Sequence, residues 1–266
     1  LNGTFSGCNE LNSVNIPNSV TIIGGGTFFD CWNLSVSLHN TVTTIGAYAF
    51  WHCPGIGSIP ESVTTIEDGA FVGSGLCTVN LPPTITEIGD FTFSECSRLQ
   101  SVTIPDHVRS IGSYAFANCQ FLTSVTISDS VTSIGSNAFD WCLSLSSIHI
   151  GNSVRDIGDW AFFGCHSLSS VTIPASVTNV GCSAFSECET LTNVIMVGET
   201  PPNECWSWPS SAIIDIPCGS YEAYYSSWGD AYTLDDNWPD FIIVLNSTDV
   251  SRGDVMMVQE IQCDSN

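Results

Sequence analysis

Lysine is absent from this sequence of 266 residues, and the only permanently charged basic side chains are four arginines. Opposed to them are 27 aspartates and glutamates, which give a formal net charge of −23. Nucleic acids and anionic membrane surfaces need a cation for each phosphate contact, so neither is an expected partner. The acidic residues form no runs, and no D-x-[DN]-x-[DN]-G calcium loop occurs. We therefore expect no metal and no cofactor.

Long apolar segments and catalytic motifs are missing as well. The longest uninterrupted apolar stretch near the end, Phe241 to Leu245, is far shorter than the ~20 residues that a membrane helix needs. We expect no membrane insertion of this fragment. The motifs G-x-S-x-G, H-E-x-x-H and the P-loop, which mark hydrolases, zinc proteases and nucleotide-binding enzymes, do not occur. The sequence therefore predicts no enzymatic activity.

One pattern, F-x-x-C, recurs along most of the chain at an almost constant period. Its phenylalanines are 21 to 23 residues apart, and Cys follows three residues later in every copy except one, where Ser74 stands instead. Two consecutive copies read SVTIPDHVRSIGSYAFANCQFLT (101–123) and SVTISDSVTSIGSNAFDWCLSLS (124–146). A single copy cannot bury its own apolar face, so the copies are expected to stack on one another.

Each copy contains two extended pieces and one compact piece. The β-branched V-T-I alternates with period two and predicts a short strand, and V-T-S-I-G predicts a second strand that ends at Gly. The segment S-Y-A-F-A-N-C is too short for an α-helix and predicts one helical or 3₁₀ turn that directs Ala, Phe and Cys inward. The expected architecture is a right-handed parallel-β solenoid of about eight 23-residue repeats.

The string L-x-x-V-x-I-P-x-x-V-x-x-I-G-x-x-A-F-x-x-C resembles the BspA-like, or Treponema-type, leucine-rich repeat of bacterial surface proteins. The resemblance covers residues 1–198 and implies a leucine-rich-repeat solenoid that binds other molecules at the cell surface or outside the cell. The copy at 57–76 is short and departs from the pattern.

The composition changes after the repeats. Residues 199–240 are rich in Trp, Tyr and Pro, resemble the capping tail of such arrays in Bacteroidetes-type proteins, and are predicted to cap the solenoid. Residues 241–266 are predicted to form a hairpin that begins a following β domain. Because the chain opens in mid-repeat without an initiator Met, we expect it to be part of a longer precursor.

Eight of the 13 cysteines occupy the F-x-x-C position and are expected to be buried thiols that pack as small apolar groups. The pairs His52-Cys53 and Cys165-His166 would suggest a thiol beside a base, but both fall at this interior position, so no catalysis is expected from them. Cys205 and Cys218 lie outside the repeat, and a disulfide between them would fit an oxidising exterior.

A candidate binding surface comes from the outward positions of the V-x-I strand. These carry short polar side chains, expected on a concave sheet of the kind that solenoids present to protein partners. The positions are Asn15, Asn80, Thr103, Thr126, His149 and Thr172.

The leading hypothesis is an adhesin-like surface protein that binds an extracellular or host-surface protein. Two alternatives remain open at this point. Aromatic residues in variable positions could stack on sugar rings, which would make the chain a glycan-binding module. They are Trp32, Tyr48, Trp51, Tyr114, Trp141 and Trp160. The solenoid could instead be a spacer that displays another domain.

Overall fold

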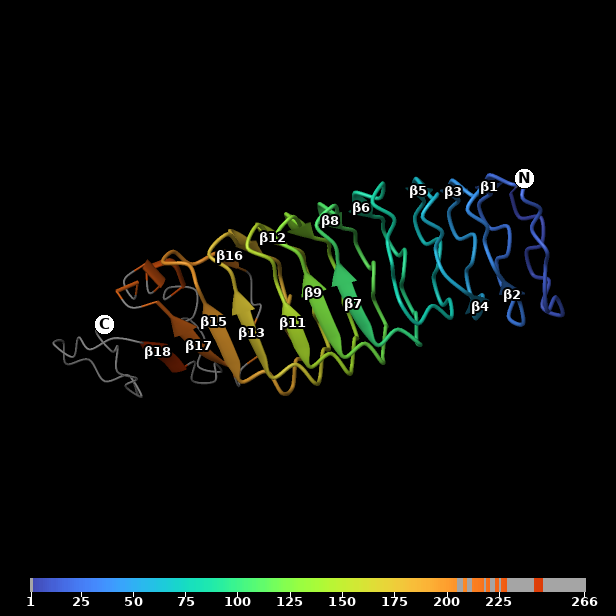
Figure 1. Ribbon diagram of the computed structural model, residues 1–266. Coiled ribbons are helices and arrows are strands. Elements are labelled where there is room, and N and C mark those ends of the chain that lie inside the picture. Colours follow the sequence, from blue (N-terminus) through green and yellow to red (C-terminus); the bar gives the residue numbers. More distant parts are fainter. Residues whose placement is uncertain are drawn as a thin grey trace.

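The computed structural model describes residues 2–204, 208, 209, 212–217, 219, 220, 223, 224 and 226–228, and the backbone of 242–245. Within this part the chain winds into stacked coils, and Figure 1 shows them following one another along an elongated body from the N-terminal end to β17. Almost all regular structure is β-strand, and the pairs of strands are parallel. The predicted leucine-rich-repeat solenoid of about eight coils is confirmed.

The V-x-I strands form one side of each coil, which we call the long-strand face. Its strands lie directly beside one another in register, with Val102 opposite Val125 and Ile104 opposite Ile127. They are β2 (Ser35–Val36), β4 (Gly55–Ile56), β7 (Ser101–Ile104), β9 (Ser124–Ile127), β11 (Ser147–His149), β13 (Ser170–Ile173), β15 (Asn193–Met196), β17 (Ile213–Ile216) and β18 (Ile242–Leu245).

The V-x-x-I-G pieces form a second side, the short-strand face, of two-residue strands that each end before the Gly or its equivalent. They are β1 (Ile22–Ile23), β3 (Thr44–Ile45), β5 (Thr65–Ile66), β6 (Glu87–Ile88), β8 (Ser110–Ile111), β10 (Ser133–Ile134), β12 (Asp156–Ile157), β14 (Asn179–Val180) and β16 (Asn203–Glu204). Strand pairing on this face stops between β5 and β6. The interruption follows the irregular copy that the sequence placed at 57–76.

The segment from Gly to Cys in each coil, which we call the turn segment, differs in detail from the expected helical or 3₁₀ turn. Successive N–H groups alternate between two acceptors. Ala117 N donates to Tyr114 O within the coil (3.1 Å), whereas Phe116 N donates to Ala138 O of the next coil (2.8 Å). Positive φ values at Tyr114 (56°) and Asn118 (58°) redirect the chain between these bonds. A helix would use every N–H internally and leave none to join the coils.

The core is a column of phenylalanine rings along the solenoid axis. Each F-x-x-C phenylalanine stacks on the next at centroid distances between 5.0 and 5.7 Å. Phe116, Phe139 and Phe162 are fully buried, and aliphatic residues of the two strand faces surround the column. Because identical side chains meet at every level, each coil is stabilised by both of its neighbours.

Aromatic residues beyond the repeats continue this packing at the C-terminal end. Trp208 stacks on Phe185 at 4.9 Å, so it adds one more ring to the column. Tyr224 Oη donates to Gly198 O (2.8 Å) and Trp228 Nε1 donates to Pro202 O (3.2 Å). These contacts place aromatic side chains against the last coil, and the cap predicted at 199–240 stays a prediction. Of the hairpin predicted at 241–266, only the backbone of β18 lies within the described residues, and it pairs in parallel with β17.

Candidate binding surface

All six residues of the predicted polar ladder are exposed. Strand pairing places Thr103, Thr126 and His149 directly beside one another on β7, β9 and β11. Thr172 lies on β13, in a second hydrogen-bonded group of strands. Asn15 and Asn80 lie outside the described strands, in coils where the long-strand face is less regular. The structure therefore makes one continuous row of the three central residues and leaves Asn15 and Asn80 outside it.

The ladder also has members that the sequence analysis missed. Ile195 pairs with Thr172, and Asp215 of β17 pairs with Ile195, so the row continues past the repeats. The alternation in N-V-I-M (193–196) is the signal that could have revealed Ile195. At this end the row changes from hydroxyl groups to an apolar side chain and a carboxyl group. Burial raises the pKa of the Asp215 carboxyl.

The His-Cys pairs do not form nucleophile and base pairs. Cys53 Sγ points inward and donates to Phe28 O (2.9 Å), and burial raises the pKa of its thiol to about 12. His52 faces outward, with Nδ1 2.8 Å from Asp30 Oδ1 and its ring 4.3 Å from that of Trp32. A thiol that stays protonated and a histidine directed to the other side of the backbone cannot act together.

The other cysteines at the F-x-x-C position repeat this arrangement. Cys119, Cys142 and Cys165 each donate a hydrogen bond to the carbonyl of a phenylalanine in the preceding coil, at Sγ to oxygen distances of 3.2 to 3.4 Å. Burial raises the pKa of all three thiols. Apart from Cys8, which is exposed, the cysteines of this position are free and buried, as expected. They pack the core and offer no reactive site.

Cys182 is different because it forms a disulfide bond. The sequence analysis assigned it no partner, and the partner lies outside the described residues. Among the described residues, nine other cysteines are free thiols. The predicted pair, Cys205 and Cys218, also lies outside the described residues and stays a prediction.

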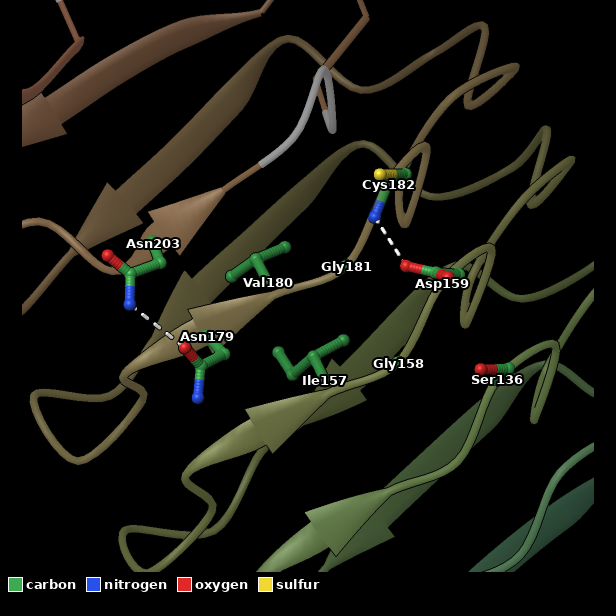
Figure 2. A pocket seen from close by; sticks show the side chains of 9 residues that line it. All are labelled: Ser136, Ile157, Gly158, Asp159, Asn179, Val180, Gly181, Cys182 and Asn203. Atoms are coloured by element: carbon green, nitrogen blue, oxygen red, sulfur yellow. Dashed lines mark hydrogen bonds between the residues drawn. The ribbon is translucent and has the colours of Figure 1, made fainter.

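A shallow groove of about 480 Å³ lies on the short-strand face between β10 and β16. Figure 2 shows its aliphatic floor, Ile157 and Val180, with polar side chains at both ends. Asn203 donates to Asn179 (3.0 Å) at one end, and Asp159 accepts from the backbone N–H of Cys182 (2.7 Å) at the other. These polar groups form hydrogen bonds between neighbouring coils. They therefore stabilise the solenoid and do not form a binding pocket for a small substrate.

Two further findings concern the described residues alone. They contain no group of three or more His, Cys, Asp or Glu side chains placed to hold a metal ion. None of their helices has the length and apolar character required to cross a bilayer.

The architecture defines a leucine-rich-repeat solenoid, a class of scaffold that typically binds other molecules through its surface. A family model described as a BspA type leucine rich repeat region matches residues 2–122, 56–140 and 109–204 in six copies. The chain belongs to this family.

Solved structures of similar proteins come from several bacteria. A leucine rich cell surface protein from Faecalibacterium prausnitzii is 29% identical, with a TM-score of 0.52, over 84% of this chain and 65% of that one. This chain thus spans slightly less than two thirds of that protein. A leucine-rich repeat protein from Eubacterium ventriosum (22% identity, TM-score 0.52, 78% and 67% covered) shares the fold. The pneumococcal vaccine antigen PcpA also shares the fold, with 17% identity and a TM-score of 0.52 over 85% of this chain and 62% of that one. No curated protein matches the chain.

Proposed function

We propose that the chain is an adhesin-like binding protein, on the cell surface or secreted, whose long-strand face binds a protein of a host or neighbouring cell. One observation carries the proposal. The interior of each coil is nearly invariant, whereas the outward ladder positions from Thr103 to Asp215 vary among hydroxyl, imidazole, apolar and carboxyl side chains. A face whose backbone is constant and whose side chains vary is suited to recognition.

The ladder side chains are held rigidly, which favours binding. Thr103 lies between Val102 and Ile104, and both neighbours are buried in the core, so the Thr side chain must point outward. The same pattern on β9 and β13 directs their Thr side chains outward from paired strands, so their hydrogen-bonding groups lose little freedom when a partner docks. The net charge of −23 favours partners with a basic surface, because opposite charge accelerates their encounter.

The family and the similar structures support a location on the cell surface or outside the cell. The F. prausnitzii protein is described as a cell surface protein, and an extracellular site also agrees with the disulfide of Cys182.

The test is binding of the purified chain to an array of extracellular matrix and host-surface proteins, followed by substitution within one coil. Thr126→Arg places a large cation in the middle of the ladder, and Thr132→Arg makes the same change at an exposed position on the short-strand face. We expect Thr126→Arg to weaken binding at least about tenfold and Thr132→Arg to leave it nearly unchanged. Equal effects of the two changes would show that the ladder is not the interface. A chain that binds nothing on the array would overturn the proposal.

A further inference from the structure

The exposed aromatic residues of the solenoid are concentrated on the turn segments, away from the long-strand face. Three of them, together with the half-buried Tyr114, occupy the same position, two residues after the Gly, in coils that are joined through this position by backbone hydrogen bonds. We call this set the aromatic column. It consists of Tyr48, Phe91, Tyr114 and Trp160.

The backbone at this position disfavours large side chains. All four residues have positive φ, between 53° and 57°, a conformation that costs an L-residue with a bulky side chain roughly 1 kcal/mol or more. In other coils the position is occupied by Gly26, Gly69, Asn137 or Ser183. Glycine and asparagine adopt this conformation more readily, so the fold does not require aromatic residues here. Their presence in four coils calls for another explanation.

The rings pack along the solenoid and leave part of their surface exposed. A Cβ on Gly69 would collide with the ring of Tyr48, which shows that this ring lies across the backbone of the next coil. Phe91 and Tyr114 stack on each other at 4.7 Å with their planes 3° apart, so each ring covers one face of the other. Tyr48 and Phe91 are each 38% exposed, and Trp160 is 45% exposed. Aromatic faces of this kind pack against the C–H groups of sugar rings.

Hydrogen-bond acceptors run beside the rings. Asp90 directly precedes Phe91, and Asp159 directly precedes Trp160. Asp90 Oδ1 accepts from Ser113 N and Asp159 Oδ1 accepts from Cys182 N, both at 2.7 Å, so each carboxylate is fixed in place. The second oxygen of each can accept a hydrogen bond from a ligand hydroxyl. Partly exposed aromatic surface next to a fixed carboxylate matches a pyranose ring, which has apolar C–H groups and hydroxyl groups.

The axial spacing indicates a chain of sugars rather than a single one. The stacked phenylalanines of the core show that one coil advances by about 5.0 to 5.7 Å, close to the length of one residue in an extended β-linked glycan. The column runs through six coils from Tyr48 to Trp160. The net charge of −23 and the scarcity of basic residues disfavour an anionic glycan.

From these observations we propose that the aromatic column binds a neutral, extended, β-linked oligosaccharide lying along the solenoid axis. This site is separate from the protein-binding ladder, and either proposal can fail while the other holds.

The experiment titrates the full chain with β-1,4-linked hexasaccharides of glucose, xylose and mannose, with the corresponding disaccharides, and with a hexasaccharide of galacturonic acid. Tryptophan fluorescence and calorimetry report binding. We expect at least one neutral hexasaccharide to bind, more tightly than its disaccharide, and the acidic hexasaccharide to bind worst.

The variants are Tyr48→Asn and Trp160→Asn, because Asn is the residue that the fold itself uses at this position in another coil and should not disturb it. Phe121→Asn is the matched control, since Phe121 is 61% exposed but lies outside the column. Each column substitution should weaken hexasaccharide binding by roughly three- to tenfold, with the melting temperature unchanged or raised, and the control should have no effect. The proposal is wrong if no neutral hexasaccharide binds, if length makes no difference, or if the column variants bind as tightly as the control.

Discussion

Removing one ring from the middle of the phenylalanine column should cost a large fraction of the stability of the solenoid. Phe139 is fully buried, and its ring stacks at 5.3 Å on both Phe116 and Phe162. Replacing a buried Phe by Ala leaves a cavity and typically costs about 3 to 5 kcal/mol. Since domains are stable by only about 5 to 15 kcal/mol, Phe139→Ala should bring the array close to unfolding at room temperature.

Two comparisons separate this effect from a general intolerance of substitution. Phe139→Leu keeps most of the buried volume and should cost roughly 1 to 2 kcal/mol. Phe121→Ala removes the same atoms from an exposed position and should change the free energy of unfolding by less than about 0.5 kcal/mol. The expected loss of unfolding free energy therefore depends on burial within the phenylalanine column and not on the loss of a phenyl group as such.

Urea unfolding followed by circular dichroism and by tryptophan fluorescence measures these differences. Two probes are needed because coils on either side of Phe139 contact only their neighbours, and a variant in the middle could let them unfold separately. If Phe139→Ala shifts the urea midpoint no more than Phe121→Ala does, the stacked rings do not hold the coils together and the account of the core given above is wrong.

Three further predictions concern the cysteines. At pH 8 a thiol reagent should label the exposed Cys8 and Cys77 in the native protein and reach the buried thiols only in urea, and fast labelling of the buried set would contradict their inward placement. The free energy of unfolding should fall as pH rises from about 9 towards 12. Burial raises the pKa of thiols such as Cys142 from 9.0 to about 12, so the unfolded chain releases protons that the folded chain keeps, and Cys142→Ser should reduce the loss. Mass spectrometry of non-reduced peptides should find Cys182 in a disulfide, and a link from it to Cys205 or Cys218 would refute the pair predicted between those two.

Much of the fold could be predicted because the repeat determines which side chains face inward. A Phe and a Cys at a constant period must meet their equivalents in the next coil, and the structure shows the stacked rings and the inward thiols. The two strands per coil follow from the alternation in V-T-I and from the Gly after the second piece.

The turn segment could not be predicted in the same way. A short run such as S-Y-A-F-A-N-C is compatible with a helical turn, and the choice depends on acceptors in the neighbouring coil, such as Ala138 O for Phe116 N, which no local pattern reveals. Positive φ at Tyr48 or Trp160 contradicts the ordinary preference of aromatic residues. The available signal was Gly26 and Gly69, which occupy the position of Tyr48 in the preceding and the next coil, since Gly is the usual residue for this conformation.

The two proposed sites follow from the same property of the solenoid. Within one coil, His149 lies on the long-strand face and Trp160 on the turn segment, and both are exposed. Since each coil is held by its interior, side chains on one face can change without altering the other. A protein bound along the ladder would leave the aromatic column open. A surface molecule that carries both a polypeptide and a neutral glycan could then engage both faces of one chain, and the second contact would form at the high effective concentration that the first creates.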